Sequence, residues 1–284
     1  MLIKLVEVLQ FEKPDWVLVY GDTNSTLAGA LAASKLHILL AHIEAGMRSY
    51  NNSMPEETNR KVADHLSQLL FCTGKNPVSN LKKEGIIKGV YLVGDLVLEA
   101  LGENVRIARQ KSRILQKLRL SRNDYYLVTI HRAENTESKE RLTELTGLLQ
   151  KLDQKTVFPL HPRTRKYLQQ YGLWNKLESA RNLELLEPVG HLDMLILEEN
   201  ARMVLTDSGG VQREAYFFGT PCVVLRRETE WTEMLGKNFQ LAKNIADLKL
   251  PKLLPRTRRK VSNPPPVSQK IISILEHESI SGKR

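Results

Sequence analysis

The 284-residue sequence is poor in the side chains that build covalent frameworks and metal clusters. It contains two cysteines, Cys72 and Cys222, too few for a disulfide framework or a cysteine-rich metal site. It also lacks a Cys/His metal spacing, a Ser–His–Asp arrangement, a Walker loop and a Gly-x-Gly-x-x-Gly segment. These absences argue against a metallohydrolase, a protease, a P-loop ATPase and an NAD enzyme. We therefore expect neither a metal nor a cofactor.

Long apolar runs are missing as well. No uncharged apolar segment approaches the ~18 residues that a membrane span requires. The N-terminal stretch carries Lys4, Glu7 and Glu12 and has no small-residue cleavage site, unlike a signal peptide. With 42% hydrophobic and 26% charged residues, the composition is that of a globular protein long enough for two domains. We expect a cytoplasmic protein with no membrane partner.

Acidic residues are fewer than basic ones, 32 against 42, which gives a formal net charge of +10. Seven basic residues fall between residues 105 and 123 without one acid, and six more lie within 249–260. The first group alternates with apolar residues at helical spacing, which is typical of the polar face of an amphipathic helix. We favour this solvated face over a nucleic-acid footprint, and we expect no nucleic-acid partner.

Short apolar segments alternate with helical patterns along most of the chain. Such alternation predicts an α/β protein with parallel strands and helices on both faces of each sheet. The basic segment near 104–123 separates two series of strands, and three prolines at 264–266 precede a last helix. The expected strands are 16–20, 37–43, 70–73, 90–94, 125–131, 156–161, 201–207 and 221–226.

The strand at 201–207 runs into Ser208, Gly209 and Gly210, and a helix follows. Open α/β sheets bind ligands at the carboxyl ends of their strands. Serine is a favoured N-cap, glycines let backbone N–H groups approach a ligand, and a helix N-terminus favours an anion. The segment therefore suits a diphosphate, although a tight strand-to-helix turn prefers the same residues. Glu214, one turn further on, could accept hydrogen bonds from ribose hydroxyls or lie in solvent.

Carboxylates follow the strands of the first series. For Asp22, an N-cap of the next helix is the simpler interpretation. Glu44 comes directly after an apolar strand, so partial burial would raise its pKa and suit it to acid or base chemistry. An ion pair with Arg48 explains Glu44 almost as well. Glu56 follows a proline at a helix start, which is typical of capping.

Histidines and arginines follow two strands of the second series. His131 and Arg132 stand where a strand enters a loop, and such a pair could neutralise a phosphate or a leaving diphosphate. His161 has Arg163 close by in the sequence. A single histidine more often has a structural role, so both interpretations stay open.

Five segments between about Pro14 and Trp231 resemble, in the same order, the non-hydrolysing UDP-N-acetylglucosamine 2-epimerases. They are VYGDTNSTLAGALAA, AHIEAGMRS, MPEETNRKVADHLSQLLF, VTIHRAENT and VLTDSGGVQREAYFFGTPCVVLRRETEW. The resemblance implies the GT-B architecture, two Rossmann-like domains with a UDP-sugar between them, and usually a homodimer. It places residues 1–103 in the first domain, 104–262 in the UDP-binding domain and 263–284 in a tail helix that packs back on the first domain.

The reaction that the resemblance implies inverts C2 of a UDP-acetamido sugar for the synthesis of cell-surface polysaccharide precursors. UDP is eliminated, a 2-acetamidoglucal forms, and UDP adds back after reprotonation on the other face. By matching motifs, the resemblance assigns proton transfer or its support to Asp22, Glu44 and Glu56. It assigns contact with the diphosphate to His131. The candidate substrate-binding residues are Arg48, Arg132, His161, Ser208, Gly209, Gly210 and Glu214.

The sequence departs from the family pattern in two places. The family's first motif, a strand ending in a Gly-Thr-Arg-Pro-Glu-like loop before a helical lysine, has no counterpart. At ~30 residues per βα unit, the resemblance implies that roughly 60–90 residues of the first domain are absent. Residues 228–231 read ETEW, which resembles a branch that acts on UDP-2,3-diacetamido uronic acids. The alternatives are a glycosyltransferase of the same fold that uses a UDP-sugar and an inactive UDP-binding fragment.

Overall fold

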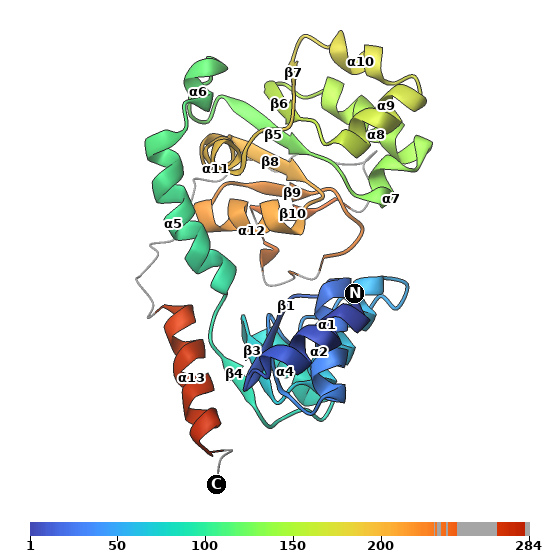
Figure 1. Ribbon diagram of the computed structural model, residues 1–284. Helices are drawn as coiled ribbons and strands as arrows, with labels where there is room; N and C mark the ends of the chain where they lie inside the picture. Colours follow the sequence, from blue (N-terminus) through green and yellow to red (C-terminus); the bar gives the residue numbers. More distant parts are fainter. Residues whose placement is uncertain (230, 232–233, 237, 243–265, 282–284) are drawn as a thin grey trace. The chain divides into compact units, whose positions relative to one another are not determined.

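The computed structural model describes residues 1–229, 231, 234–236, 238–242 and 266–281 (Figure 1). Glu230 and the basic group within 249–260 lie outside the described residues. The chain forms two compact units: unit 1 comprises residues 1–99 with 261–284, and unit 2 comprises residues 100–260. The division falls within one helix, α5 (Leu96–Lys111). Each unit has a parallel sheet of its own.

Unit 1 contains four parallel strands in the order β1-β2-β3-β4, each joined to the next by a helix. Its register pairs Val19 with His42 and Ile43 with Phe71. The carboxyl ends of β1 and β2 therefore lie side by side. The elements are α1 (Leu2–Glu12), β1 (Trp16–Tyr20), α2 (Asn24–Lys35), β2 (Leu39–Ile43), α3 (Pro55–Leu66), β3 (Leu69–Cys72), α4 (Lys75–Lys83) and β4 (Val90–Leu92).

Helices cover both faces of the first sheet. On one face, small residues of α2 and α3 such as Ala30 and Ala63 pack against β1 and β2, and α4 packs against β3. On the other face, α13 (Val267–Ser281) inserts Val267 and Ile271 among residues of β2 and β3. The indole of Trp16 donates a hydrogen bond of 2.7 Å to the Ser279 hydroxyl. Helix α13 therefore completes the core of unit 1.

Unit 2 contains six parallel strands in the order β10-β9-β8-β5-β6-β7. The chain proceeds from β5 outward to β6 and β7, and then returns to the other side of β5 as β8. A topological switch point therefore lies between β5 and β8, where open α/β sheets bind ligands. The strands are β5 (Tyr125–Thr129), β6 (Lys155–Pro159), β7 (Leu183–Leu186), β8 (Met203–Thr206), β9 (Cys222–Val224) and β10 (Phe239–Leu241).

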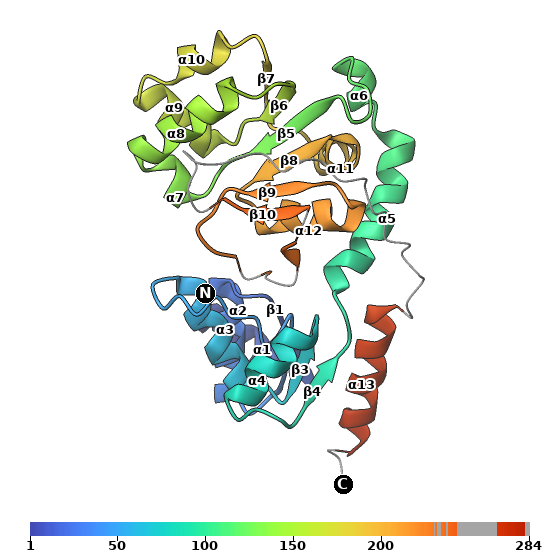
Figure 2. The ribbon, with the colours of Figure 1, turned by 180° about the vertical axis from the view of Figure 1, so that it is seen from behind.

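The helices of unit 2 lie in two layers (Figure 2). Leucines of α8, α9 and the segment leading into α10 pack on Tyr126, Val128 and Phe158. On the opposite face, the hydroxyl of Tyr125 donates to the carbonyl of Leu197 in α11. The helices are α6 (Ile114–Lys117), α7 (Ala133–Thr136), α8 (Lys139–Gln150), α9 (Pro162–Gln170), α10 (Trp174–Glu178), α11 (His191–Asn200) and α12 (Gly209–Phe218).

Two expectations need correction. The basic segment 105–123 is not one helix, because α5 ends at Lys111 and only the short α6 follows. Ser112 interrupts the pattern: its hydroxyl donates to Asp193 and accepts a hydrogen bond from the amide of Ile114. The strands β7 and β10 were not predicted.

Both cysteines are buried and unpaired. Burial, with a smaller contribution from the charge of Asp64, raises the pKa of Cys72 to about 12. Burial likewise raises the pKa of Cys222. Neither thiol ionises near neutral pH, so neither has the thiolate that nucleophilic chemistry needs. Among the described helices, none is long and apolar enough to cross a membrane.

Candidate active site

A serine-capped turn that suits an anion occupies the switch point of unit 2. Ser208 is the N-cap of α12, and its Oγ accepts a hydrogen bond of 3.4 Å from the amide of Val211. The Thr206 hydroxyl accepts one of 2.9 Å from the amide of Ser208. A Cβ added to Gly210 would have one atom within 4 Å, Ser208 Oγ at 3.6 Å. The space before the first amides of the helix is therefore open, as an incoming phosphate requires.

Asp207 fastens the loop after β5 to this turn. Its carboxylate is fully buried and accepts hydrogen bonds from the amides of His131 and Arg132, at 3.1 and 3.0 Å. It also accepts one of 2.9 Å from the side-chain amide of Asn135. These contacts bring His131 to the carboxyl end of β8. Asp207 and Asn135 were not among the predicted site residues, although both lie within the motifs that carry the resemblance.

His131 stands at the edge of this turn, with 37% of its side chain exposed. Burial lowers the pKa of its imidazole; the charge of Asp207 opposes the change, and His161, Arg132 and Arg163 add to it. The ring is therefore neutral near pH 7. An anion bound beside it would favour the protonated form, so His131 can supply positive charge where a ligand demands it.

The two histidines predicted for the site lie together. The rings of His131 and His161 are 5.5 Å apart between centroids. His161 is also the N-cap of α9, because its Nδ1 accepts a hydrogen bond of 3.1 Å from the amide of Arg163. Its proton therefore resides on Nε2, the nitrogen that is left to meet a ligand. Within the described residues the Arg132 guanidinium has no hydrogen bond or ion pair.

A pocket of about 210 Å³ opens beside the turn. Its walls combine apolar and aromatic groups with the Ser208 cap, which suits a flat heteroaromatic ring next to a phosphate. The pocket adjoins the ends of β5, β6 and β7. The side chains relevant to a ligand are His131, His161, Pro188, Val189, Met194 and Ser208.

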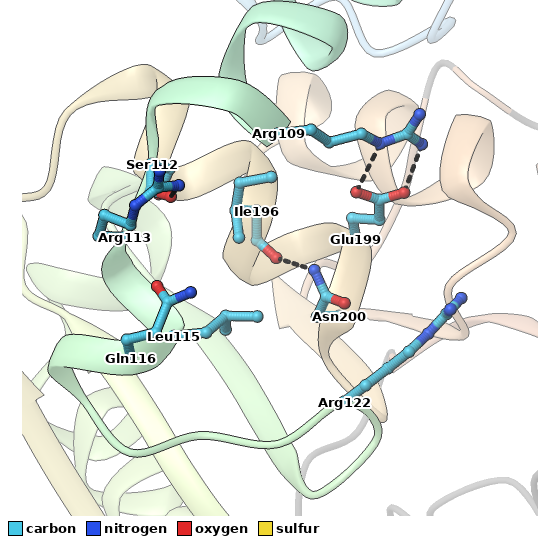
Figure 3. A pocket seen from close by; sticks show the side chains of 9 residues that line it. All are labelled: Arg109, Ser112, Arg113, Leu115, Gln116, Arg122, Ile196, Glu199 and Asn200. Atoms are coloured by element: carbon cyan, nitrogen blue, oxygen red, sulfur yellow. Dashed lines mark hydrogen bonds and ion pairs between the residues drawn. The ribbon is translucent and has the colours of Figure 1, made fainter.

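A different pocket, of about 310 Å³, lies between α5, α6 and α11 (Figure 3). Three arginines of the basic segment line it, Arg109, Arg113 and Arg122. However, the Glu199 carboxylate neutralises Arg109 and accepts hydrogen bonds of 3.1 and 2.5 Å from its guanidinium. The pocket lies among helices rather than at the carboxyl ends of strands. We therefore place the site of unit 2 at Ser208 and His131.

In unit 1, Glu44 has an unusual backbone conformation directly after β2. Its φ is 72°, in the left-handed region that costs a non-glycine residue about 1–2 kcal/mol. The amides of Glu44 and Ala45 both donate to the carbonyl of Phe71, at 3.1 Å, which fixes the turn to β3. Residues held in such conformations cluster at functional sites. The side chain of Glu44 is half-buried.

Arg48 was expected to bind substrate, but the structure places it in a buried ion cluster. Its guanidinium contacts Asp64 at 2.7 Å and Glu84 at 2.7 and 2.6 Å. Burial alone would lower the pKa of Arg48, but the two carboxylates outweigh burial and raise it. Within the described residues Arg48 does not pair with Glu44, so that explanation of Glu44 is wrong. Arg48 instead holds the loop that carries Glu44.

Asp64 is the centre of this cluster. It is fully buried and also receives hydrogen bonds from His42 Nδ1 at 2.7 Å and from the amide of Gly46 at 3.1 Å. The other ring nitrogen of His42 contacts the carbonyl of Gly21 at 2.8 Å. The cluster therefore joins the ends of β1, β2 and α3.

Asp22 lies beside this cluster and is not the N-cap of α2, a position that Thr23 takes. Its carboxylate contacts the Arg60 guanidinium at 2.5 Å, and Arg60 also binds Glu57 at 2.8 Å. Glu57 accepts the amides of Ser49 and Tyr50. Burial would raise the pKa of Glu57, but these hydrogen bonds and Arg60 lower it.

Glu56, the neighbour of Glu57, is half-buried and has no hydrogen bond or ion pair with any described residue. Unit 1 thus brings Asp22 and Glu44 to adjacent strand ends and places Glu56 at the start of α3. The other predicted residues, including Glu214 on α12, belong to unit 2.

The site is consistent with the similarity of the chain to known proteins. Residues 1–245 match the family described as UDP-N-acetylglucosamine 2-epimerase. The chain is 50% identical over 247 residues to a UDP-N-acetylglucosamine 2-epimerase homolog of Methanococcus maripaludis, covering 86% of this chain and 69% of that protein. It is 46% identical to the UDP-2,3-diacetamido-2,3-dideoxy-D-glucuronate 2-epimerase of Pseudomonas aeruginosa, covering 83% and 65%.

A solved structure shows the same fold. The crystal structure of Methanocaldococcus jannaschii UDP-GlcNAc 2-epimerase in complex with UDP-GlcNAc and UDP superposes with a TM-score of 0.83 at 38% identity. The comparison covers 97% of this chain and 79% of that structure. The expected α/β fold of the GT-B type is therefore confirmed. The chain belongs to the UDP-N-acetylglucosamine 2-epimerase family, a family of isomerases.

Proposed function

We propose that this chain epimerises C2 of a UDP-N-acetylhexosamine, or of a related UDP-acetamido sugar, in the synthesis of cell-surface polysaccharide precursors. The observation that carries the proposal is that this member of the family has both an anion-binding turn and a set of carboxylates at strand ends. Unit 2 presents an anion-binding turn at its switch point, and unit 1 presents carboxylates at the carboxyl ends of its strands. A UDP-sugar needs the first, and inversion at a carbon needs the second.

Unit 2 binds the UDP moiety in this proposal. The amides that follow Ser208, beginning with those of Gly209 and Gly210, receive the diphosphate, and Gly210 leaves room for its oxygens. His131 and Arg132 supply positive charge, and the pocket next to Ser208 receives the base. Glu214 accepts hydrogen bonds from the ribose hydroxyls.

The reaction proceeds by elimination and re-addition. A base removes the proton from C2, the C1–O bond breaks, and UDP leaves with the bonding electrons while a C1–C2 double bond forms. An acid then protonates C2 from the opposite face, and a diphosphate oxygen of UDP attacks C1. His131 and Arg132 stabilise the charge that develops on the departing diphosphate.

Asp22, Glu44 and Glu56 provide proton transfer or its support. Asp22 is oriented by Arg60, and Glu44 is held by the backbone of β3. Both therefore present their carboxylates from rigid supports, as proton transfer between fixed atoms requires. Glu56 has no partner among the described residues and can turn toward a substrate.

The substrate branch is a part of the proposal that the sequence itself suggests. The ETEW segment and the 46% identity to the diacetamido-glucuronate epimerase favour a diacetamido uronic acid beside UDP-N-acetylglucosamine. Of this segment, Trp231 is buried and its ring lies 4.6 Å from the Arg213 guanidinium. Assaying both sugars distinguishes the two branches.

The test incubates the purified chain with each UDP-sugar in D2O and follows C2 by NMR. Deuterium at C2 with the inverted product supports the proposal. Transfer of the sugar to an acceptor without exchange at C2 would identify a glycosyltransferase, and binding without turnover an inactive UDP-binding chain. Glu44→Gln is expected to lose C2 exchange and retain UDP binding. Glu7→Gln, on the exposed face of α1, is the matched control.

Two further parts of the proposal concern organisation. We assign residues 1–103 and 104–262 to the first and second domains and 263–284 to a tail of the first, which the contact boundary at Glu99 and Ala100 supports. We also propose a cytoplasmic homodimer, on the resemblance to the family. Light scattering on the purified chain measures the mass directly, and a monomer would refute the dimer.

A further inference from the structure

A buried acid lies behind the proposed UDP site and takes no part in the mechanism above. Glu198 sits in the last turns of α11, with a side chain that is fully buried. Neither of its carboxyl oxygens receives a hydrogen bond from an N–H or O–H donor of the described residues. A buried carboxylate without donors is strongly disfavoured, so this group demands another explanation.

The group that faces Glu198 is the carboxyl of Glu214 in α12, the helix that packs beside α11. Two carboxyl groups make a hydrogen bond only when one of them carries a proton. Burial raises the pKa of Glu198 well above its usual value, and the charge of Glu214 raises it further. Glu198 is the deeper of the two, since Glu214 is half-exposed.

The surroundings of Glu198 agree with a neutral acid. The thiol of Cys222, which lies near Glu198, is uncharged and fully buried in β9. Thr220 donates a hydrogen bond of 3.0 Å to the main-chain carbonyl of Glu198, which anchors the end of α11. A proton on the Glu198 side chain can be donated to the Glu214 carboxylate, which lies within hydrogen-bond reach.

We propose that Glu198 is a positioning residue: a buried carboxylic acid that donates a hydrogen bond to Glu214 and holds its carboxylate toward the ribose. This inference rests on the proposed role of Glu214 in binding the ribose hydroxyls. A vicinal diol needs acceptor oxygens in a fixed plane, and a free glutamate side chain would have to be ordered on binding. The hydrogen bond from Glu198 orders it beforehand.

The pair also limits the negative charge near the diphosphate. Glu214 lies on the helix that Ser208 caps, so each carboxylate added there opposes the binding of an anion at the helix N-terminus. A protonated Glu198 gives Glu214 an orienting donor and adds no charge. A basic side chain at position 198 would neutralise Glu214. An ionised Glu198 carboxylate would repel the anionic ligand.

The first experiment compares the affinities of UDP and 2′-deoxy-UDP, by calorimetry, for the wild type, Glu198→Met and Glu198→Gln. Methionine fills the space but has no hydrogen-bond donor. We therefore expect UDP to bind about tenfold more weakly, which is the effect of losing a hydrogen bond to a charged group. The affinity for 2′-deoxy-UDP should fall less, and the preference for the ribose diol should shrink. Glutamine retains an N–H donor, so Glu198→Gln should restore both the affinity for UDP and the preference for the ribose diol.

Three results would overturn the proposal. They are an unchanged preference in Glu198→Met, an equal loss for both nucleotides, and a failure of Glu198→Gln to restore the preference. The Glu214→Gln variant separates this inference from the proposed function. If that variant keeps the wild-type preference for UDP, Glu214 does not bind the ribose, and the proposed role of Glu214 fails by itself.

A spectroscopic measurement covers the case in which Glu198→Met does not fold. The infrared difference spectrum of wild type minus Glu198→Gln should contain the carbonyl-stretch band of a protonated carboxylic acid. This band reports the proton whatever ligand the protein binds. Its absence from the wild type at neutral pH would refute the acid–carboxylate pair.

Discussion

Replacing Arg48 with methionine distinguishes a structural cation from a substrate-binding one. Methionine has a similar length and removes the charge together with every donor. Asp64 would then keep the hydrogen bonds from His42 and Gly46, but it would lose the cation at 2.7 Å. The loop that carries Glu44 would lose the links that Arg48 makes to Asp64 of α3 and to Glu84.

The expected loss follows from burial. The side chains of Arg48 and Asp64 are fully buried, and that of Glu84 is 24% exposed. Removing one partner of a buried ion pair costs about 3–5 kcal/mol. Because Glu84 can turn toward water, we expect the lower end, ~3 kcal/mol. A domain stability of about 5–15 kcal/mol leaves the variant folded but measurably weaker.

Hydrogen exchange with mass spectrometry, at increasing urea, measures this loss within unit 1. Peptides from β2 and α3 should lose protection in Arg48→Met, and peptides from β5 and β8 should not. The control is Arg106→Met, which removes an exposed pair with Glu103 and should cost ~0–1 kcal/mol. Unchanged protection in Arg48→Met together with a higher KM would refute the reasoning and return Arg48 to the substrate.

Three other changes test the site and its support. Gly210→Ala should fold, since its Cβ would lie 3.6 Å from Ser208 Oγ. Its affinity for UDP, measured by calorimetry, should fall about tenfold (~1.4 kcal/mol). An unchanged affinity would place the phosphate elsewhere. Gly46→Ala should lower the free energy of unfolding, measured by urea denaturation, by ~2–4 kcal/mol, because φ is +78° and the Cβ would lie 2.5 Å from the Pro77 carbonyl oxygen. Wild-type stability would contradict that geometry. The pKa of His131 is lowered in the free chain, and a bound diphosphate favours the protonated ring. Binding of UDP-N-acetylglucosamine, whose diphosphate does not titrate here, should therefore take up a proton and tighten as the pH falls below neutrality. A slope that persists in His131→Asn would assign it to another group.

The sequence predicts the strand series well because strands and helices of a parallel sheet have different apolar periods. The strands of unit 2 that were predicted lie within one or two residues of the expected bounds. Ser208 as an N-cap was confirmed, since capping depends on neighbours in the chain. β7 and β10 were missed because a polar residue, Glu184 in β7 and Gln240 in β10, interrupts each short apolar segment.

Long-range partners could not be predicted from local pattern. Arg48 meets Glu84, 36 residues away, and Asp22 meets Arg60, 38 residues away. A signal did exist for part of the cluster, because Glu57, Arg60 and Asp64 recur at helical spacing on one face of α3. Charged residues at that spacing are normally read as a solvated surface, and here all three are buried.

The same limit explains why Glu198 was not a candidate. It stands beside Glu199 near the end of a helix, where acids are usually exposed. Only the packing of α11 against α12 shows that one glutamate points inward. The structure therefore adds supporting residues, which hold the ligand-contacting side chains in place. A sequence motif reveals the ligand-contacting residues more readily than it reveals their supports.

The two buried cysteines have a practical consequence for labelling. Cys72 and Cys222 are the whole thiol content of the chain, and burial raises the pKa of both. A maleimide or iodoacetamide dye should therefore leave the native chain unmodified. One cysteine introduced on the exposed surface of unit 2 would carry the fluorophore alone. Nucleotide binding could then be followed by fluorescence in a chain that keeps both native cysteines.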